Sequence, residues 1–144
     1  MNKITLTSAF FEDPKTRDAT ISMLENSPEL FGAIVDKIDT YALSKLEMKK
    51  LVIPRGVHTI APKACINNSH IEVLDARYIS SLGDLAFAHC PNLREIYLPC
   101  NLRFSAGHNS PFFNCPQAAT KVVYCDENGN AVHTYENDPY EFKD

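Results

Sequence analysis

The chain has 144 residues, a formal net charge of −4 and a pI near 5.7. This length suits one domain with a continuous core, and the acidic balance argues against nucleic-acid binding, which needs a basic stripe. The sequence contains no apolar run of about 18 residues, so it predicts no membrane span.

The N-terminal 47 residues differ in pattern from the rest and are expected to form a helical cap. The opening residues, MNKITLTSAFFEDPK, lack the sustained apolar stretch of a secretory signal. Residues 4–6 alternate in polarity, which indicates a short strand. Asp13 followed by Pro14 is typical of a helix start, so a first helix is expected from there.

A second helix is predicted over about 28–45. Ser27 suits the N-cap, Pro28 suits the first helical position and Glu29 places an acid in the first turn. Helical spacing then relates the apolar residues Leu30, Phe31, Ile34, Val35, Ile38, Tyr41 and Ala42. The cap would cover the open end of the segment that follows, because solenoids need covered ends. The alternative is a helix that binds a partner or a second copy.

From Leu51 onward the sequence repeats itself about every 22 residues. The copies begin at Leu51, Leu74 and Ile96, which are 23 and 22 residues apart, and a strand-like segment follows at Val122. The aligned apolar positions are Leu51, Leu74 and Ile96; Ile53, Ala76 and Leu98; Val57, Ile79 and Leu102; and Ile60, Leu82 and Phe104. A period in the twenties predicts a solenoid in which neighbouring coils share a core.

Each position of the repeat has a physical role. The apolar triplets alternate with period two, so short parallel strands are expected at 51–53, 74–76, 96–98 and 122–124, all in one sheet. Phe87 is expected to fill a coil interior, and Gly83 to permit a turn. At the coil corner, Asn68 is expected to bond backbone groups that the turn leaves free or to fill a small buried gap.

The segment Leu82-Gly83-Asp84-Leu85-Ala86-Phe87-Ala88-His89-Cys90-Pro91-Asn92-Leu93, followed by Ile96-Tyr97-Leu98-Pro99, resembles the BspA-type leucine-rich repeats. The first copy departs from that pattern at Ala61, Cys65 and Asn68, and the third has Phe112-Phe113 in place of Ala-Phe. The resemblance implies an α/β-type repeat solenoid with short parallel strands, here over residues 48–125, and it implies a protein-interaction module.

Residues 126–144 are expected to form a C-terminal β-hairpin and a polar tail. Asn128-Gly129 is a strong two-residue turn signal, and residues 131–135 would return as the second strand. Asp126, Asn128 and Asn130 have a faint likeness to a calcium loop, but Ala131 occupies the position that requires glycine.

The sequence offers little chemistry. Its five cysteines include no C-x-x-C pair, which favours reduced thiols in a cytoplasmic protein over disulfides or a metal site. Its histidines are scattered. Cys100 and His108 would supply a thiol and a base if they met, but Cys100 simply follows the strand-ending Pro99. We expect no enzyme activity, no cofactor and no metal.

The outward residues of the strand triplets form the candidate binding surface. They are Val52, Asp75, Tyr97 and Val123, with Arg77 beside the strand ends. Tyrosine and arginine are enriched at interface hot spots. We therefore expect a non-catalytic module that binds a larger protein through this sheet face. The alternative is a structural, homo-oligomeric protein that assembles through the N-terminal helix or the solenoid edge.

Overall fold

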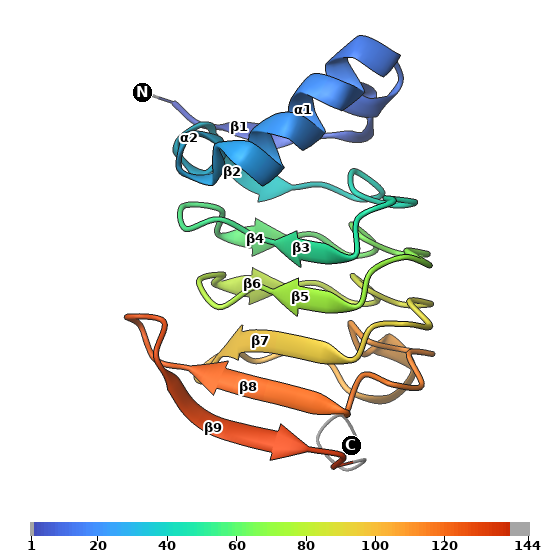
Figure 1. The fold of residues 1–144 in the computed structure, drawn as a ribbon, viewed down its shortest axis with the longest axis vertical. Helices are drawn as coiled ribbons and strands as arrows, with labels where there is room; N and C mark the ends of the chain where they lie inside the picture. Colours follow the sequence, from blue (N-terminus) through green and yellow to red (C-terminus); the bar gives the residue numbers. More distant parts are fainter. Residues whose placement is uncertain (1, 139–144) are drawn as a thin grey trace.

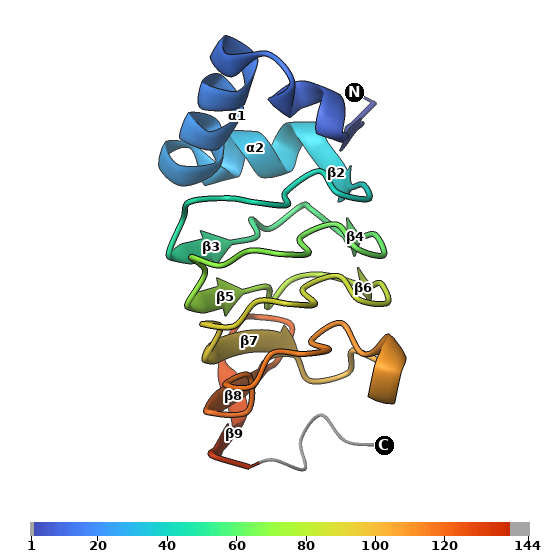
Figure 2. The same ribbon diagram turned by 90° about the vertical axis from the view of Figure 1, so that its right-hand side faces the viewer.

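The computed structural model describes residues 2–138, and the chain winds as a solenoid between two sheets (Figures 1 and 2). The larger sheet has the order β3-β5-β7-β8-β9, and the smaller has the order β1-β2-β4-β6. The larger sheet consists of β3 (Lys50–Val52), β5 (Val73–Asp75), β7 (Glu95–Pro99), β8 (Lys121–Cys125) and β9 (Ala131–Glu136). The smaller consists of β1 (Ile4–Leu6), β2 (Val35–Ile38), β4 (Thr59–Ile60) and β6 (Ser81–Leu82). The helices are α1 (Pro14–Asn26) and α2 (Pro28–Ile34), and the 3-10 turns are η1 (Ser8–Phe11) and η2 (Gly107–Asn109).

The predicted strands are neighbours in one parallel sheet, and their register is the predicted one. Leu51 pairs with Leu74, Leu74 with Ile96, and Ile96 with Val122. All four side chains are fully buried. The observed β3, β5, β7 and β8 each begin one residue before their predicted starts. The solenoid and its sheet are confirmed.

The predicted helix over 28–45 is wrong beyond residue 34. Helix α2 ends at Ile34, and the next four residues form β2. Ile38 pairs with Ile60 of β4, which pairs in turn with Leu82 of β6. The apolar spacing that suggested a helix therefore buries these residues from a strand, because pairing with the next coil outweighs helix propensity.

The residues after β2 form an additional coil, in a stretch where the sequence pattern predicts the cap. Ile38, Ala42 and Leu43 lie 22 residues before Ile60, Ala64 and Cys65, and all six are buried. The backbone N–H of Leu43 donates to the Ala64 carbonyl, as the N–H of Cys65 does to Ala86 one coil later. The boundary predicted at residue 48 therefore falls inside the stacked coils.

The predicted strand over 4–6 and the predicted helix start at Asp13-Pro14 are confirmed. Strand β1 pairs in parallel with β2, and α1 begins at Pro14. The Asp13 carboxylate accepts from the Thr16 backbone N–H at 3.0 Å, which caps the helix. Ser27 is the N-cap of α2 but makes no side-chain capping bond.

The interior of the coils contains the predicted anchors. Phe87 is fully buried and stacks on Phe112 with ring centroids 6.0 Å apart. The buried Asn68 amide accepts from the Leu46 N–H and donates to the carbonyls of Leu43 and Cys65. The side chain thus satisfies backbone groups of two coils, as expected at that corner.

Gly83 has a different role from the predicted one. Its φ is not in the left-handed region, but a Cβ there would lie 2.3 Å from the backbone nitrogen of Pro62 in the preceding coil. Close approach of two coils, rather than turn conformation, excludes a side chain at this position.

The C-terminal hairpin is confirmed, but its predicted two-residue turn is wrong. The Asp126 N–H donates to the Asn130 carbonyl, so residues 127–129 form the connection, and only Gly129 among them has a positive φ. Strand β9 pairs antiparallel with β8 and closes the larger sheet at the end of the solenoid opposite the helices (Figure 1). The part of the predicted tail from 139 to 144 lies outside the described residues.

Candidate functional site

The outer face of the larger sheet presents three of the four predicted strand residues. Val52 pairs with Asp75, and Asp75 with Tyr97, so the three form one row across β3, β5 and β7. Val52 is 37% exposed, whereas Asp75 and Tyr97 are half-buried. Val123 continues the row but is only 4% exposed.

The predicted exposure of Val123 is therefore wrong. In the sheet it lies between Tyr97 of β7 and Thr134 of β9. The repeat pattern alone puts Val123 on the last strand with one open side, but the hairpin adds a further strand there. Of the predicted residues, Val123 has the least surface to offer a partner.

Ion pairing and hydrogen bonding join the other residues of the row. The Arg77 guanidinium binds both carboxylate oxygens of Asp75, each at 2.9 Å, and lies 4.8 Å from the centre of the Tyr97 ring. The Tyr97 hydroxyl donates to Glu95 at 2.7 Å. This hydrogen bond is the main cause that raises the pKa of Tyr97 to about 12. This network restrains the side chains of Asp75, Arg77 and Tyr97 in the free protein.

A second arginine–tyrosine stack lies one coil toward the helices. The Arg55 guanidinium is 4.2 Å from the centre of the Tyr78 ring, in the range of a cation–π contact. Arg55 is exposed and Tyr78 is half-buried. Within residues 2–138, no carboxylate forms an ion pair with Arg55.

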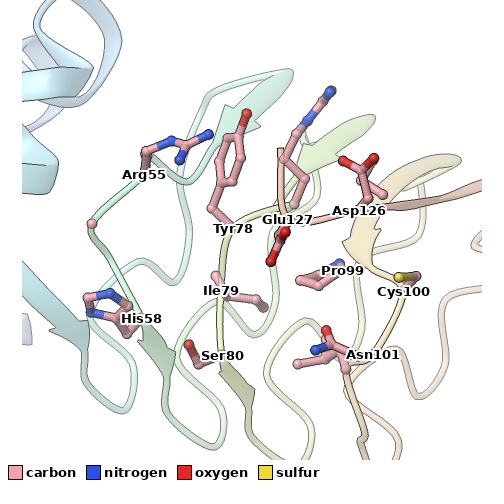
Figure 3. Close-up of a pocket in the computed structure, with 14 residues that line it drawn as sticks. Arg55, His58, Tyr78, Ile79, Ser80, Pro99, Cys100, Asn101, Asp126 and Glu127 are labelled. Atoms are coloured by element: carbon pink, nitrogen blue, oxygen red, sulfur yellow. The ribbon is translucent and has the colours of Figure 1, made fainter. Parts of the chain in front are cut away.

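A cavity of about 670 Å³, here called the rim cavity, follows the ends of the parallel strands. Figure 3 shows Arg55 directed toward Tyr78 on one side, with Glu127 and Asp126 of the hairpin turn on another. Turns of successive coils provide the floor of the cavity. The lining residues are Arg55, Gly56, His58, Arg77, Tyr78, Ile79, Ser80, Pro99, Cys100, Asn101, Leu102, Cys125, Asp126 and Glu127.

A groove of about 540 Å³, here called the cap groove, lies between helix α2 and the first strands of the larger sheet. Its lining is mainly apolar and includes the exposed Val52. It shares Arg55, Gly56 and Tyr78 with the rim cavity, so the Arg55–Tyr78 stack separates two adjoining hollows. The lining residues are Pro28, Glu29, Gly32, Ala33, Val52, Ile53, Pro54, Arg55, Gly56, Asp75 and Tyr78.

The contribution of α2 to this region was not predicted. A Cβ on Gly32 would lie 2.0 Å from the Arg55 carbonyl oxygen, so the helix backbone rests directly against the turn after β3. The glycine inside a predicted helix was the available signal, because such a residue often marks close packing. Which residue Gly32 packs against could not be read from this signal, because it depends on where the helix ends.

The described residues show no arrangement suited to catalysis or metal binding. Cys100 is exposed in the rim cavity, while His108 lies on η2 beside Phe113 and does not line that cavity. Burial raises the pKa of the Cys65 thiol, which keeps it protonated. No group of three histidine, cysteine or acidic side chains in residues 2–138 could hold a metal ion.

One family model matches most of the chain. The family model for the BspA type leucine-rich repeat region, six copies, matches residues 29–130. This chain belongs to the BspA-type leucine-rich repeat family. The match begins well before residue 48, in agreement with the additional coil after β2. Leucine-rich repeat solenoids are typically non-catalytic scaffolds. No curated protein and no solved structure matches the chain. In the described part of this repeat protein, no helix is long and apolar enough to cross a membrane.

Proposed function

We propose that this BspA-type repeat protein is an interaction module that binds a segment of another protein across the Arg55–Tyr78 stack. The observation that carries the proposal is the position of this stack between two adjoining hollows, next to the exposed Val52. The sheet-face residues Asp75, Arg77 and Tyr97 would extend the contact. Val123 is left out because it is buried.

The chemistry of the region indicates what the segment must offer. The apolar cap groove next to Val52 suits an aliphatic or aromatic side chain, because burying such a group gives about 25 cal/mol for each Å². Arg55 suits a carboxylate, since no acidic side chain of residues 2–138 pairs with it. An apolar side chain followed by an acidic one would therefore match both features.

The Arg77–Tyr97 stack favours binding for an entropic reason. Ordering a long side chain on association costs roughly 0.5–1.5 kcal/mol. Arg77 already has two hydrogen bonds to Asp75 and a third to the Gly129 carbonyl, so little freedom remains to be lost. The cytoplasmic location, inferred from the reduced cysteines, belongs to the same proposal. Four of the five thiols are buried, where cysteine acts as a small apolar residue.

The test begins with affinity capture from the source cell and identification of the bound protein by mass spectrometry. Its affinity for the purified chain is then measured by calorimetry for the wild type, Val52→Asp and Arg55→Glu. We expect each variant to weaken binding roughly tenfold or more, as at interface hot spots.

The matched control is Ile4→Asp. Ile4 is 41% exposed, like Val52 at 37%, and is also β-branched and on a strand, but it belongs to the other sheet. This variant should bind like the wild type. Equal affinity for all four proteins, with folding verified by thermal melting, would remove the cap groove and Arg55 from the binding site.

A further inference from the structure

Strand β9 forms the outer edge of the larger sheet. In the part of the chain that the structure describes, it pairs with β8 on one side and with no strand on the other. Five of its six residues are exposed, among them Val132 at 49%. Edge strands are usually protected by lysine, proline or a covering element, because their free backbone groups attract another strand. Strand β9, with the sequence AVHTYE, contains neither lysine nor proline.

The direction of the free backbone groups follows from the bonds of β8. The Lys121 N–H donates to Arg94, and the Cys125 carbonyl accepts from Cys100, so the odd-numbered residues of β8 face β7. Val122 and Tyr124 therefore face β9. Their partners there, Tyr135 and His133, point their backbone groups back toward β8. Because backbone direction alternates along a strand, the N–H and C=O groups of Thr134 and Glu136 point outward.

Two irregularities define the flat part of this edge. The register shifts between Tyr124 and Cys125, which leaves Val132 as the extra residue of a bulge. At the other end, Asn137 has a φ of 53° and leaves the extended conformation. The regular edge therefore runs from His133 to Glu136, with Tyr135 midway between the two outward residues.

We propose that β9 pairs antiparallel with β9 of a second copy of this chain, about a twofold axis at Tyr135. Thr134 of each copy then lies opposite Glu136 of the other. These two pairs exchange four backbone hydrogen bonds. The larger sheets of the two copies become one continuous sheet.

Three features favour a second copy over an unrelated strand. When two copies of β9 pair about Tyr135, Thr134 of each copy lies opposite Glu136 of the other. Both outward residues of both strands are therefore paired in a single register. That register brings no like charges face to face, since each Glu136 meets a threonine. It also places the two half-buried Tyr135 rings as a direct cross-strand pair, which aromatic residues favour. Within its own copy Tyr135 already contacts Tyr124 edge to face, with centroids 5.9 Å apart.

The proposal goes beyond the proposed function and is independent of it. The cap groove lies at the helical end of the solenoid, whereas β9 closes the opposite end (Figure 1). At the helical end of the larger sheet the edge strand is β3, and helix α2 rests against the turn that follows it. Pairing of β9 with β9 about a twofold axis uses the same edge in both copies, so the assembly closes as a dimer.

The first test is the mass of the full chain by light scattering and sedimentation equilibrium, from micromolar to millimolar concentration. We expect a reversible dimer. Thr134→Pro removes an outward N–H that β8 does not use, and should weaken dimerisation roughly ten- to hundredfold. Thr134→Ala keeps the N–H and is the matched control, with dimerisation close to that of the wild type. A chain that stays monomeric throughout, or a dimer equally stable in Thr134→Pro, would overturn the proposal.

A second measurement needs no variant. Amide hydrogen exchange of the wild type should slow with rising concentration at Thr134 and Glu136. Exchange at His133 and Tyr135, whose amides face β8, should be slow at every concentration. In Thr134→Pro, slow exchange at those two amides would verify that the hairpin has folded. Protection that rises elsewhere but not at Thr134 and Glu136 would exclude this edge. Val52→Asp should leave the dimer unchanged, so failure of either proposal can be told from failure of the other.

Discussion

The Nη1 atom of Arg77 donates to the carbonyl oxygen of Gly129 over 2.8 Å, although the two residues are 52 positions apart. Arg77 follows β5, whereas Gly129 is in the turn between β8 and β9. The bond therefore links the tip of the C-terminal hairpin, across β7, to the coil that contains β5. Gly129 is buried there, and a Cβ on it would lie 2.3 Å from the Tyr78 hydroxyl. One face of the rim cavity depends on this docking.

We expect Gly129→Ala to lower the free energy of unfolding by roughly 1–3 kcal/mol. The residue has a φ of +86°, which strains any side chain, and the methyl group would meet Tyr78. Chemical denaturation of the single variants and of Gly129→Ala combined with Tyr78→Ala forms a double-mutant cycle. The pair should cost less than the sum of the single changes, because the truncated tyrosine removes the clash. Strict additivity would mean that the hairpin turn does not rest on Tyr78.

Phe87→Ala should lower the free energy of unfolding by about 3–5 kcal/mol. The ring is fully buried and stacks on Phe112, so its removal opens a cavity that rigid coils cannot close. In a short array such a loss spreads, because each coil depends on its neighbours. The half-buried Phe113 is the control, and Phe113→Ala should cost less. Equal melting temperatures for the two alanine variants would contradict the assigned core.

Asn68→Ala should cost roughly 2–4 kcal/mol, because it takes the side-chain partner from the Leu46 N–H and the Leu43 carbonyl. It also leaves the Cys65 carbonyl with only the weak Cys90 thiol as a side-chain donor. Asn92 provides the comparison, since its exposed side chain donates a single hydrogen bond, to Ser69. Asn92→Ala should change stability by no more than about 0.5 kcal/mol. Denaturant unfolding of both variants measures the difference, and similar small losses would mean that water reaches the Asn68 corner.

Stability should fall with rising pH in a window set by Tyr97. Its hydrogen bond to Glu95 and its burial raise its pKa to about 12, whereas an unfolded tyrosine has a pKa of about 10. Between these values the unfolded chain has lost the proton that the folded chain keeps, so stability is full below about pH 10 and decreases toward pH 12. Tyr97→Phe should lack this part of the decrease.

Unfolding free energies of the wild type and Tyr97→Phe, measured across this window, isolate the effect from other alkaline titrations. Glu95→Gln should lower the Tyr97 pKa toward its ordinary value, because the carboxylate that accepts the hydroxyl proton is gone. The pKa of Tyr97 is measured by following phenolate absorbance in the ultraviolet during a pH titration. The difference between the curves of the variants with and without Tyr97 gives the contribution of this residue. Parallel stability curves for wild type and Tyr97→Phe would show that the hydroxyl is not held by Glu95.

The sequence by itself determined the solenoid, because the repeat places one apolar residue at each position that must face the core. Leu51, Leu74, Ile96 and Val122 align by their spacing alone, and they pair in that order in the sheet. The hairpin followed from the Asn128-Gly129 signal, although residues 127–129 connect its paired ends and only Gly129 among them has a positive φ.

Tertiary structure decided what local spacing left ambiguous. Val35 and Ile38 fit both a helix face and a strand, and pairing with β1 and β4 selected the strand. Val123 has the pattern of an exposed residue, but it is buried in the folded chain beside the predicted hairpin strand. The Arg55–Tyr78 stack, the α2 wall of the cap groove and the Arg77–Gly129 bond join residues from different coils. Such contacts depend on how the coils stack in space, and no local pattern in the sequence encodes them.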